Sequence, residues 1–139
     1  MYLLHGKNIT CGYDAVDILS GCTVGVKKGE IASIVGPNGA GKSTAMKSIF
    51  GLLKIKIGKV YLDNEDITDL LPQERVLKGM GYVPQTNNIF PTLSVQENLE
   101  MGAFVQNEDF SDILDYVYDL FPVLKEKKNQ QAGELSGGQ

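Results

Sequence analysis

The first thirty positions combine short strand-like runs with turn-forming residues. The runs cover residues 2–9 and 16–26, and residues 12–14, Gly-Tyr-Asp, lie between them. In the second run, apolar side chains at every second position share one face, as in a strand that buries one side. These side chains belong to Cys22, Val24 and Val26. We therefore expect antiparallel strands on either side of a turn at residues 12–14.

The next pattern is an apolar run, a glycine-rich loop and a helix. Residues 30–35, Glu-Ile-Ala-Ser-Ile-Val, lack polar alternation, which is typical of a strand buried on both faces. Glycines occupy three of the six positions in residues 36–41. From Lys42 onward, apolar residues recur at the i, i+3, i+4 and i+7 spacing of a helix that packs on a sheet. They are Met46, Ile49, Phe50 and Leu53.

Local signals also predict the elements of the second half. Residues 58–62 followed by Asp63-Asn64 indicate a strand and a tight turn, because Asn tolerates the left-handed conformation. Pro72 suits the first turn of a helix. Residues 81–84 predict a short strand that leads to Gln85. The sequence from Ser94 to Glu97 has the capping-box pattern that begins a helix.

A second helical stripe follows near the end of the chain. Its apolar positions are Ile113, Val117, Leu120, Phe121 and Leu124. Pro122 interrupts the stripe, and three lysines follow at positions 125, 127 and 128. Positive side chains are favourable near the negative, C-terminal end of a helix, so these lysines indicate that the helix ends here.

Composition narrows the class of protein. The 139 residues have room for one domain, and 42% hydrophobic residues indicate a globular chain. No apolar run approaches the roughly 18 residues of a membrane span, and no secretion signal precedes the first strand, so we expect a cytosolic location. The net charge of −4 disfavours nucleic acid as a partner. Cys11 and Cys22 lack metal or redox spacing, and the single His5 suggests no role.

Residues 36–43, Gly-Pro-Asn-Gly-Ala-Gly-Lys-Ser, fit the phosphate-binding P-loop (Walker A) pattern GxxxxGK[ST]. A loop of this kind lets backbone N–H groups converge on phosphate oxygens at a helix N-terminus. We expect Lys42 to reach the β- and γ-phosphates, Ser43 to bind Mg²⁺, and Thr44 to open the helix beside them. A plain glycine-rich turn is the alternative. The remaining loop positions expected to contact nucleotide are Gly36, Pro37, Asn38, Gly39, Ala40 and Gly41.

A second motif, Leu-Ser-Gly-Gly-Gln at residues 135–139, resembles the signature motif of ABC ATP-binding domains. Alone, such a turn could cap or link helices. Together with the P-loop and with Tyr-Val-Pro-Gln at residues 82–85, its order and spacing resemble an ABC ATP-binding domain along the whole chain.

The resemblance implies an α/β fold: a P-loop NTPase core with an N-terminal antiparallel β subdomain and a helical subdomain. Residues 1–84 would form the β subdomain and the core, and residues 85–139 the glutamine loop and the helical subdomain. The family's pattern continues beyond the signature motif with a strand ending in Asp-Glu and with a histidine. We therefore expect a truncated gene product or fragment that lacks C-terminal core strands and does not turn over ATP alone.

The resemblance also assigns roles. Tyr13 matches the aromatic residue that stacks on adenine, and the alternative is a tyrosine of the core. Gln85 matches the glutamine that senses Mg²⁺ and the attacking water, so Lys42 and Gln85 are the expected catalytic residues, and Ser43 and Gln85 the metal-binding ones. The signature residues would contact the γ-phosphate held by a second subunit. These residues are Ser136, Gly137, Gly138 and Gln139.

The expected cofactors are ATP and Mg²⁺, and the expected partners are a second ATP-binding subunit and transmembrane permease subunits that hold the chain on the inner face of the membrane. Residues 90–104 and 115–128 look most like the ATPases of branched-chain amino acid importers. Importers of urea or short amides, and a non-catalytic nucleotide-binding fragment, remain as alternatives. ABC ATPases that act on DNA or ribosomes are disfavoured by the acidic charge and by the lack of a coiled-coil insert.

Overall fold

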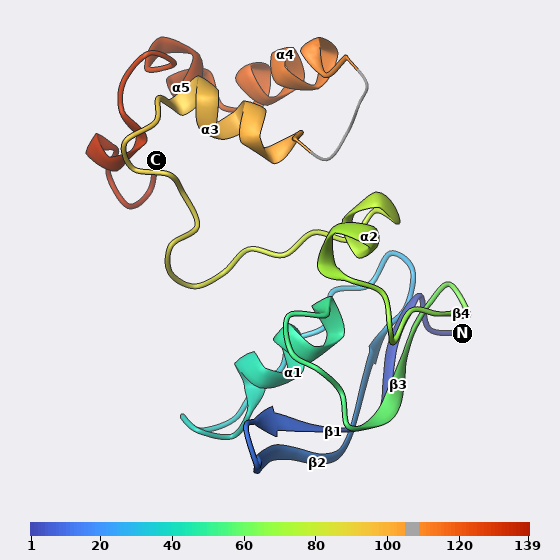
Figure 1. The fold of residues 1–139 in the computed structure, drawn as a ribbon. Helices are drawn as coiled ribbons and strands as arrows, with labels where there is room; N and C mark the ends of the chain where they lie inside the picture. Colours follow the sequence, from blue (N-terminus) through green and yellow to red (C-terminus); the bar gives the residue numbers. More distant parts are fainter. Residues whose placement is uncertain (105–108) are drawn as a thin grey trace. The chain divides into compact units, whose positions relative to one another are not determined.

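A computed structural model describes residues 1–104 and 109–139, which divide into two compact units (Figure 1). The first unit comprises Met1–Met80 and the second Gly81–Gln139. Among the described residues, no helix combines the length and the apolar character that a membrane span requires.

A four-stranded antiparallel sheet forms the base of the first unit. Its strands are β1 (Leu4–Tyr13), β2 (Val16–Val26), β3 (Ile57–Leu62) and β4 (Glu65–Asp66), in the order β2-β1-β3-β4. The expected antiparallel strands are confirmed, and so is the α/β fold class.

The two hairpin turns of this sheet use residues that tolerate positive φ. Asp63 and Asn64 have φ values of 47° and 66°, so the predicted tight turn between β3 and β4 is confirmed. The first turn differs from the prediction, because β1 continues through residues 12–13 and Tyr13 pairs with Val16. The chain instead turns at Asp14, whose φ of 52° an aspartate side chain can accept.

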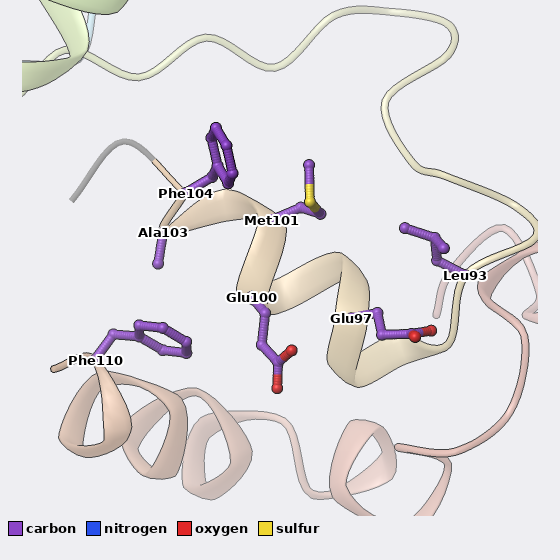
Figure 2. A pocket seen from close by; sticks show the side chains of 7 residues that line it. All are labelled: Leu93, Glu97, Glu100, Met101, Ala103, Phe104 and Phe110. Carbon is purple, nitrogen blue, oxygen red and sulfur yellow. The ribbon is translucent and has the colours of Figure 1, made fainter. Parts of the chain in front are cut away.

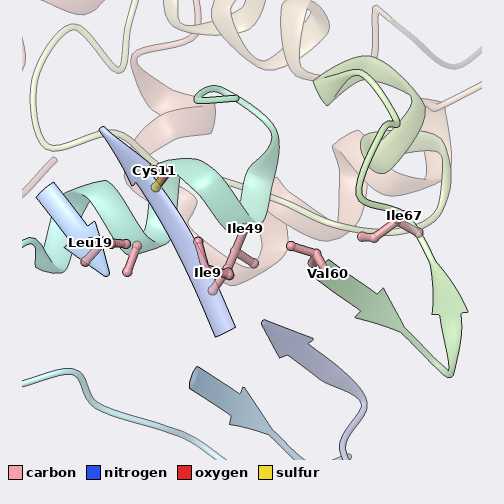
Figure 3. Close-up of a cluster of buried hydrophobic side chains, with 7 residues drawn as sticks. Ile9, Cys11, Leu19, Ile49, Val60 and Ile67 are labelled. Atoms are coloured by element: carbon pink, nitrogen blue, oxygen red, sulfur yellow. The ribbon is translucent and has the colours of Figure 1, made fainter. Parts of the chain in front are cut away.

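Helix α1 (Lys42–Phe50) lies against the sheet and closes the core of the first unit. Figure 3 shows the buried cluster between α1 and the strands. Its members are Ile9, Cys11, Leu19, Ala45, Ile49, Val60 and Ile67. Met46 is exposed, so the predicted apolar stripe was wrong at this position. The buried face of α1 instead carries the small residues Ala45 and Ser48. Their small side chains let the helix approach the sheet closely.

The apolar run at residues 31–35 forms no strand in the structure, and the prediction of a buried strand was wrong here. Ile31 is 98% exposed and Val35 is 88% exposed. A strand needs neighbours that accept and donate its backbone hydrogen bonds, and the four strands of the sheet pair only with one another. Residues 81–84 differ from the prediction in the same way and have no strand structure.

Helix α2 (Pro72–Leu77) completes the first unit, and Pro72 occupies its first turn as predicted. The second unit contains α3 (Val95–Gly102), α4 (Ser111–Leu120), α5 (Pro122–Glu126) and a short 3-10 helix (Ala132–Glu134).

The capping box that begins α3 is confirmed. The Ser94 hydroxyl accepts from the N–H of Glu97 at 3.2 Å, and the Glu97 carboxylate accepts from the N–H of Ser94 at 2.7 Å. The carboxylate accepts hydrogen bonds from the N–H and from the hydroxyl of Ser94, and these two bonds hold the pKa of Glu97 below its usual range. Pro122 is the first residue of α5, so it interrupts the helical stripe as predicted. The stripe itself was wrong in part, because the buried side chain of α4 is Tyr118, whereas Ile113 and Leu120 are exposed.

Candidate nucleotide-binding site

The glycine-rich loop leads directly into α1. Gly39 and Gly41 have φ values of 84° and 88°, which favour glycine over residues with a Cβ. At Gly41, an added Cβ would also lie 2.7 Å from Cδ2 of Leu19 in β2. Gly41 therefore meets two independent requirements, a left-handed backbone and close packing on the sheet.

The side chain of Lys42 folds back onto this loop. Its Nζ donates to the carbonyl oxygens of Gly36 at 2.8 Å and of Pro37 at 2.7 Å. The ammonium group therefore lies inside the curve of the loop. A phosphate oxygen carries negative charge, so it attracts the ammonium more strongly than a neutral carbonyl oxygen does and would compete well for this donor.

The N-terminus of α1 supplies backbone donors to the same place. The residue before the helix is Gly41, which has no side chain to cap the first turn, and that turn contains no acidic residue. The first N–H groups of a helix lack partners within it and carry the positive end of its dipole. A cation and unopposed N–H groups therefore meet at one point, which suits an anion.

The two expected ligand residues in the first turn of α1 differ in how exposed their side chains are. The side chain of Ser43 is exposed, whereas that of Thr44 is buried, so Thr44 can offer a ligand only its backbone N–H. Asn38 and Ala40 are exposed on the loop. The described residues contain no cluster of three or more His, Cys, Asp or Glu that could hold a metal.

Tyr13 lies at the end of β1 and is 46% exposed, which does not fit the alternative of a core residue. The Nζ atom of Lys47 on α1 is 3.5 Å from its hydroxyl oxygen and 5.9 Å from its ring centroid. This contact joins the tyrosine to the helix that begins at the phosphate-binding loop.

Sequence reasoning missed Arg75, the sole arginine of the chain, which is 1% exposed. Its guanidinium donates to the carbonyls of Ser48 and Ile49 at the end of α1. It also donates to the carbonyls of Leu70 and Thr68. Burial lowers the pKa of the guanidinium, and the nearby charge of Asp69 opposes this shift. Arg75 thus fixes the far end of the helix that carries the candidate phosphate site.

Gln85 belongs to the second unit and is exposed. The loop that follows it is fixed by Asn98, which sequence reasoning also missed. The Asn98 side-chain oxygen accepts from the N–H of Phe90 at 2.7 Å, and its amide donates to the carbonyls of Phe90 and Ser94, each at 2.9 Å. An asparagine four residues into a predicted helix gives no sequence signal of this contact.

The signature residues also lie in the second unit, on an exposed turn. The Gln139 N–H donates to the Ser136 carbonyl at 2.9 Å. The Gln139 side-chain oxygen accepts from the Ser136 N–H and from Nζ of Lys127, each at 3.2 Å. Gly137 and Gly138 have open space where a Cβ would point, so their backbone is accessible.

A cavity of about 420 Å³ lies in the second unit beside α3. It is lined by Leu93, Glu97, Glu100, Met101, Ala103, Phe104 and Phe110. Figure 2 shows Glu100, Ala103 and Phe110 in the space between α3 and the start of α4. Two carboxylates and an otherwise apolar lining do not suit a polyphosphate, so this cavity is not the candidate nucleotide site.

Comparison with known proteins agrees with this geometry. The family model described as ABC transporter matches residues 19–139. The chain is 42% identical over 138 residues to a probable branched-chain amino acid transport ATP-binding protein, LivF, of Archaeoglobus fulgidus, which covers 99% of this chain and 58% of the relative. The chain thus spans about three fifths of the length of this relative.

Solved structures of similar sequence have the same fold. A nucleotide-free ATP-binding cassette from an ABC transporter superposes with a TM-score of 0.79 at 34% identity, covering 99% of this chain and 60% of the other. A dimeric cassette in a post-hydrolysis state, bound to ADP and Pi, superposes with a TM-score of 0.76 at 32% identity, covering 98% and 64%. The motifs, the loop geometry and these matches together show that the chain belongs to the ABC transporter family.

Proposed function

We propose that the chain binds ATP through residues 36–44 and that, in the whole protein, ATP binding and hydrolysis drive the import of a small solute. The observation that carries this proposal is the ammonium of Lys42 held inside the loop, at 2.8 Å and 2.7 Å from two carbonyls, beside an acid-free helix N-terminus. The loop thus concentrates hydrogen-bond donors and positive charge at one point, although the net charge of the whole chain is −4.

When ATP binds, the ammonium of Lys42 donates to the β- and γ-phosphates in place of the two loop carbonyls. The backbone N–H groups of the first turn of α1 bind phosphate oxygens. Ser43 supplies an exposed hydroxyl to Mg²⁺, which neutralises phosphate charge when bound. Thr44 contributes through its backbone. Tyr13 offers its exposed ring to adenine.

The second unit supplies the remaining proposed roles. Gln85 interacts with Mg²⁺ and the attacking water, and the exposed Ser136–Gln139 turn contacts the nucleotide of a second ATP-binding subunit. The open space beside Gly137 and Gly138 supports this role, because it leaves room for a phosphate to approach the backbone. The dimeric form of a related cassette bound to ADP and Pi supports a two-subunit assembly.

We further propose branched-chain amino acids as the solute and permease subunits as the membrane partners, which would hold the chain at the cytoplasmic face of the membrane. The name of the LivF relative, a branched-chain amino acid transport ATP-binding protein, supports this assignment. The absence of a membrane-spanning helix among residues 1–104 and 109–139 is compatible with a peripheral subunit.

Titration of a fluorescent ATP analogue against the wild-type chain and Lys42→Ala tests the binding site. One charge-assisted hydrogen bond contributes about 1.5–3 kcal/mol, so we expect affinity to fall about ten- to hundredfold. Lys54→Ala, which removes an exposed lysine outside the loop, is the matched control and should bind as wild type does. Equal binding by wild type and Lys42→Ala, with both folded by circular dichroism, would contradict the proposal.

A further inference from the structure

Lys47 lies in the last turn of α1, one helical turn after Ser43, and contacts Tyr13 across 34 positions of sequence. Its Nζ lies 3.5 Å from the Tyr13 hydroxyl oxygen and 5.9 Å from the ring centroid, which places it beyond the hydroxyl edge of the ring and not over a face. At this edge the ammonium donates to the hydroxyl oxygen. The contact therefore restrains an exposed side chain that terminates its strand.

Alternative partners do not account for the position of this lysine. Among the ion pairs of the described residues, none includes Lys47. A lysine in the last turn of a helix is favourable near the negative end of the dipole, but this effect does not require contact with an aromatic ring. The direction of the side chain toward Tyr13 thus calls for an explanation of its own.

We infer that Lys47 is a positioning residue for recognition of the nucleotide base. It contacts the hydroxyl edge of the Tyr13 ring from α1 and leaves the faces of the ring for adenine. The inference rests on the proposed function, because it assigns Lys47 a part in the same ATP site. It also explains how the base-binding ring and the phosphate-binding loop keep a fixed spacing, since α1 carries the end of the loop and the lysine together.

The size of the effect follows from the geometry. The distance of 3.5 Å is long for a hydrogen bond, and Tyr13 is 46% exposed, so the contact belongs at the weak end of intramolecular hydrogen bonds. We expect Lys47→Met to weaken ATP binding about two- to fivefold, the range that corresponds to a weak net hydrogen bond. Methionine keeps the length and the apolar stem of the side chain and removes the charge.

Comparison of ATP with inorganic tripolyphosphate separates positioning of the base from simple loss of charge. Tripolyphosphate has no base, so it reports only on the loop and the helix N-terminus. The affinities of both ligands, with Mg²⁺, are measured by calorimetry for wild type, Lys47→Met, Tyr13→Ala and the double variant. Lys54→Met is the matched control, because it removes one exposed lysine just beyond α1.

The inference predicts that Lys47→Met weakens ATP binding, leaves tripolyphosphate binding unchanged, and has no further effect once Tyr13 is alanine. An equal loss for both ligands would overturn it, because Lys47 would then act on phosphate. A loss of ATP affinity that persists in the Tyr13→Ala background would overturn it as well. If wild type binds neither ligand, the proposed function itself fails, and this result is distinct from a failure that concerns Lys47 alone.

Discussion

Substitution of Arg75 should destabilise the first unit more than any surface change. Arg75→Ala leaves the carbonyls of Ser48, Thr68 and Leu70 without the guanidinium donor, two of whose bonds measure 2.8 Å and 3.0 Å. An unsatisfied buried acceptor costs about 1–3 kcal/mol, so the two acceptors of the short bonds, the carbonyls of Thr68 and Leu70, give a loss of about 2–6 kcal/mol. This loss is a large part of the roughly 5–15 kcal/mol that stabilises a typical domain.

Urea unfolding followed by far-UV circular dichroism measures this effect. Arg75→Met preserves the apolar stem and removes the donors, so it separates hydrogen bonding from packing, and we expect it to retain most of the loss. Lys78→Ala is the control on the same helix terminus. It breaks an exposed ion pair with Glu65 of 2.7 Å, worth about 0–1 kcal/mol. A loss below about 1 kcal/mol for Arg75→Ala, or equal losses for both positions, would refute the reasoning.

Three further predictions concern single positions. Gly41→Ala should lower stability by about 1–3 kcal/mol and weaken ATP binding, because φ is 88° and the new Cβ would meet Leu19; Gly137→Ala, in open space, should change stability little. Tyr13→Ala should weaken ATP binding by about 0.5–1.5 kcal/mol, whereas Tyr13→Phe, which keeps the ring and loses only the hydroxyl contact with Lys47, should weaken it less in the same titration. Hydrogen bonds to Lys59 and Thr68 lower the pKa of Asp66 to about 2, so its stabilising contribution is present above the unfolded pKa and is lost as pH falls through about 2. Acid unfolding of Asp66→Asn should lack this component.

Local signals in the sequence predicted several elements well. The turn at Asp63-Asn64, the start of α2 at Pro72 and the capping box at Ser94 were all predicted. Each depends on residues within a few positions of one another, and the backbone preferences of those residues decide the result. The P-loop motif is local in the same sense, because its glycines and its lysine all lie within residues 36–42.

Features that depend on distant neighbours could not be predicted in this way. The apolar pattern of residues 31–35 indicates a strand, but a strand also requires hydrogen-bonding partners, which the pattern does not contain. The exposure of Met46 reflects how closely α1 approaches the sheet. Arg75 binds carbonyls 26 and 27 residues away, and Lys47 contacts a ring 34 residues away. Only the packing of α1 brings these groups together.

Residues 36–44 are the proposed ATP-binding site of this chain. Backbone amide chemical shifts of the ¹⁵N-labelled chain, recorded as Mg²⁺ and ATP are added, locate the bound nucleotide. We expect the largest shifts at the amides of Gly39, Gly41, Lys42 and Ser43, with smaller shifts at Tyr13. Unchanged shifts at these amides, with the largest changes instead at the residues that line the cavity beside α3, would contradict the proposal.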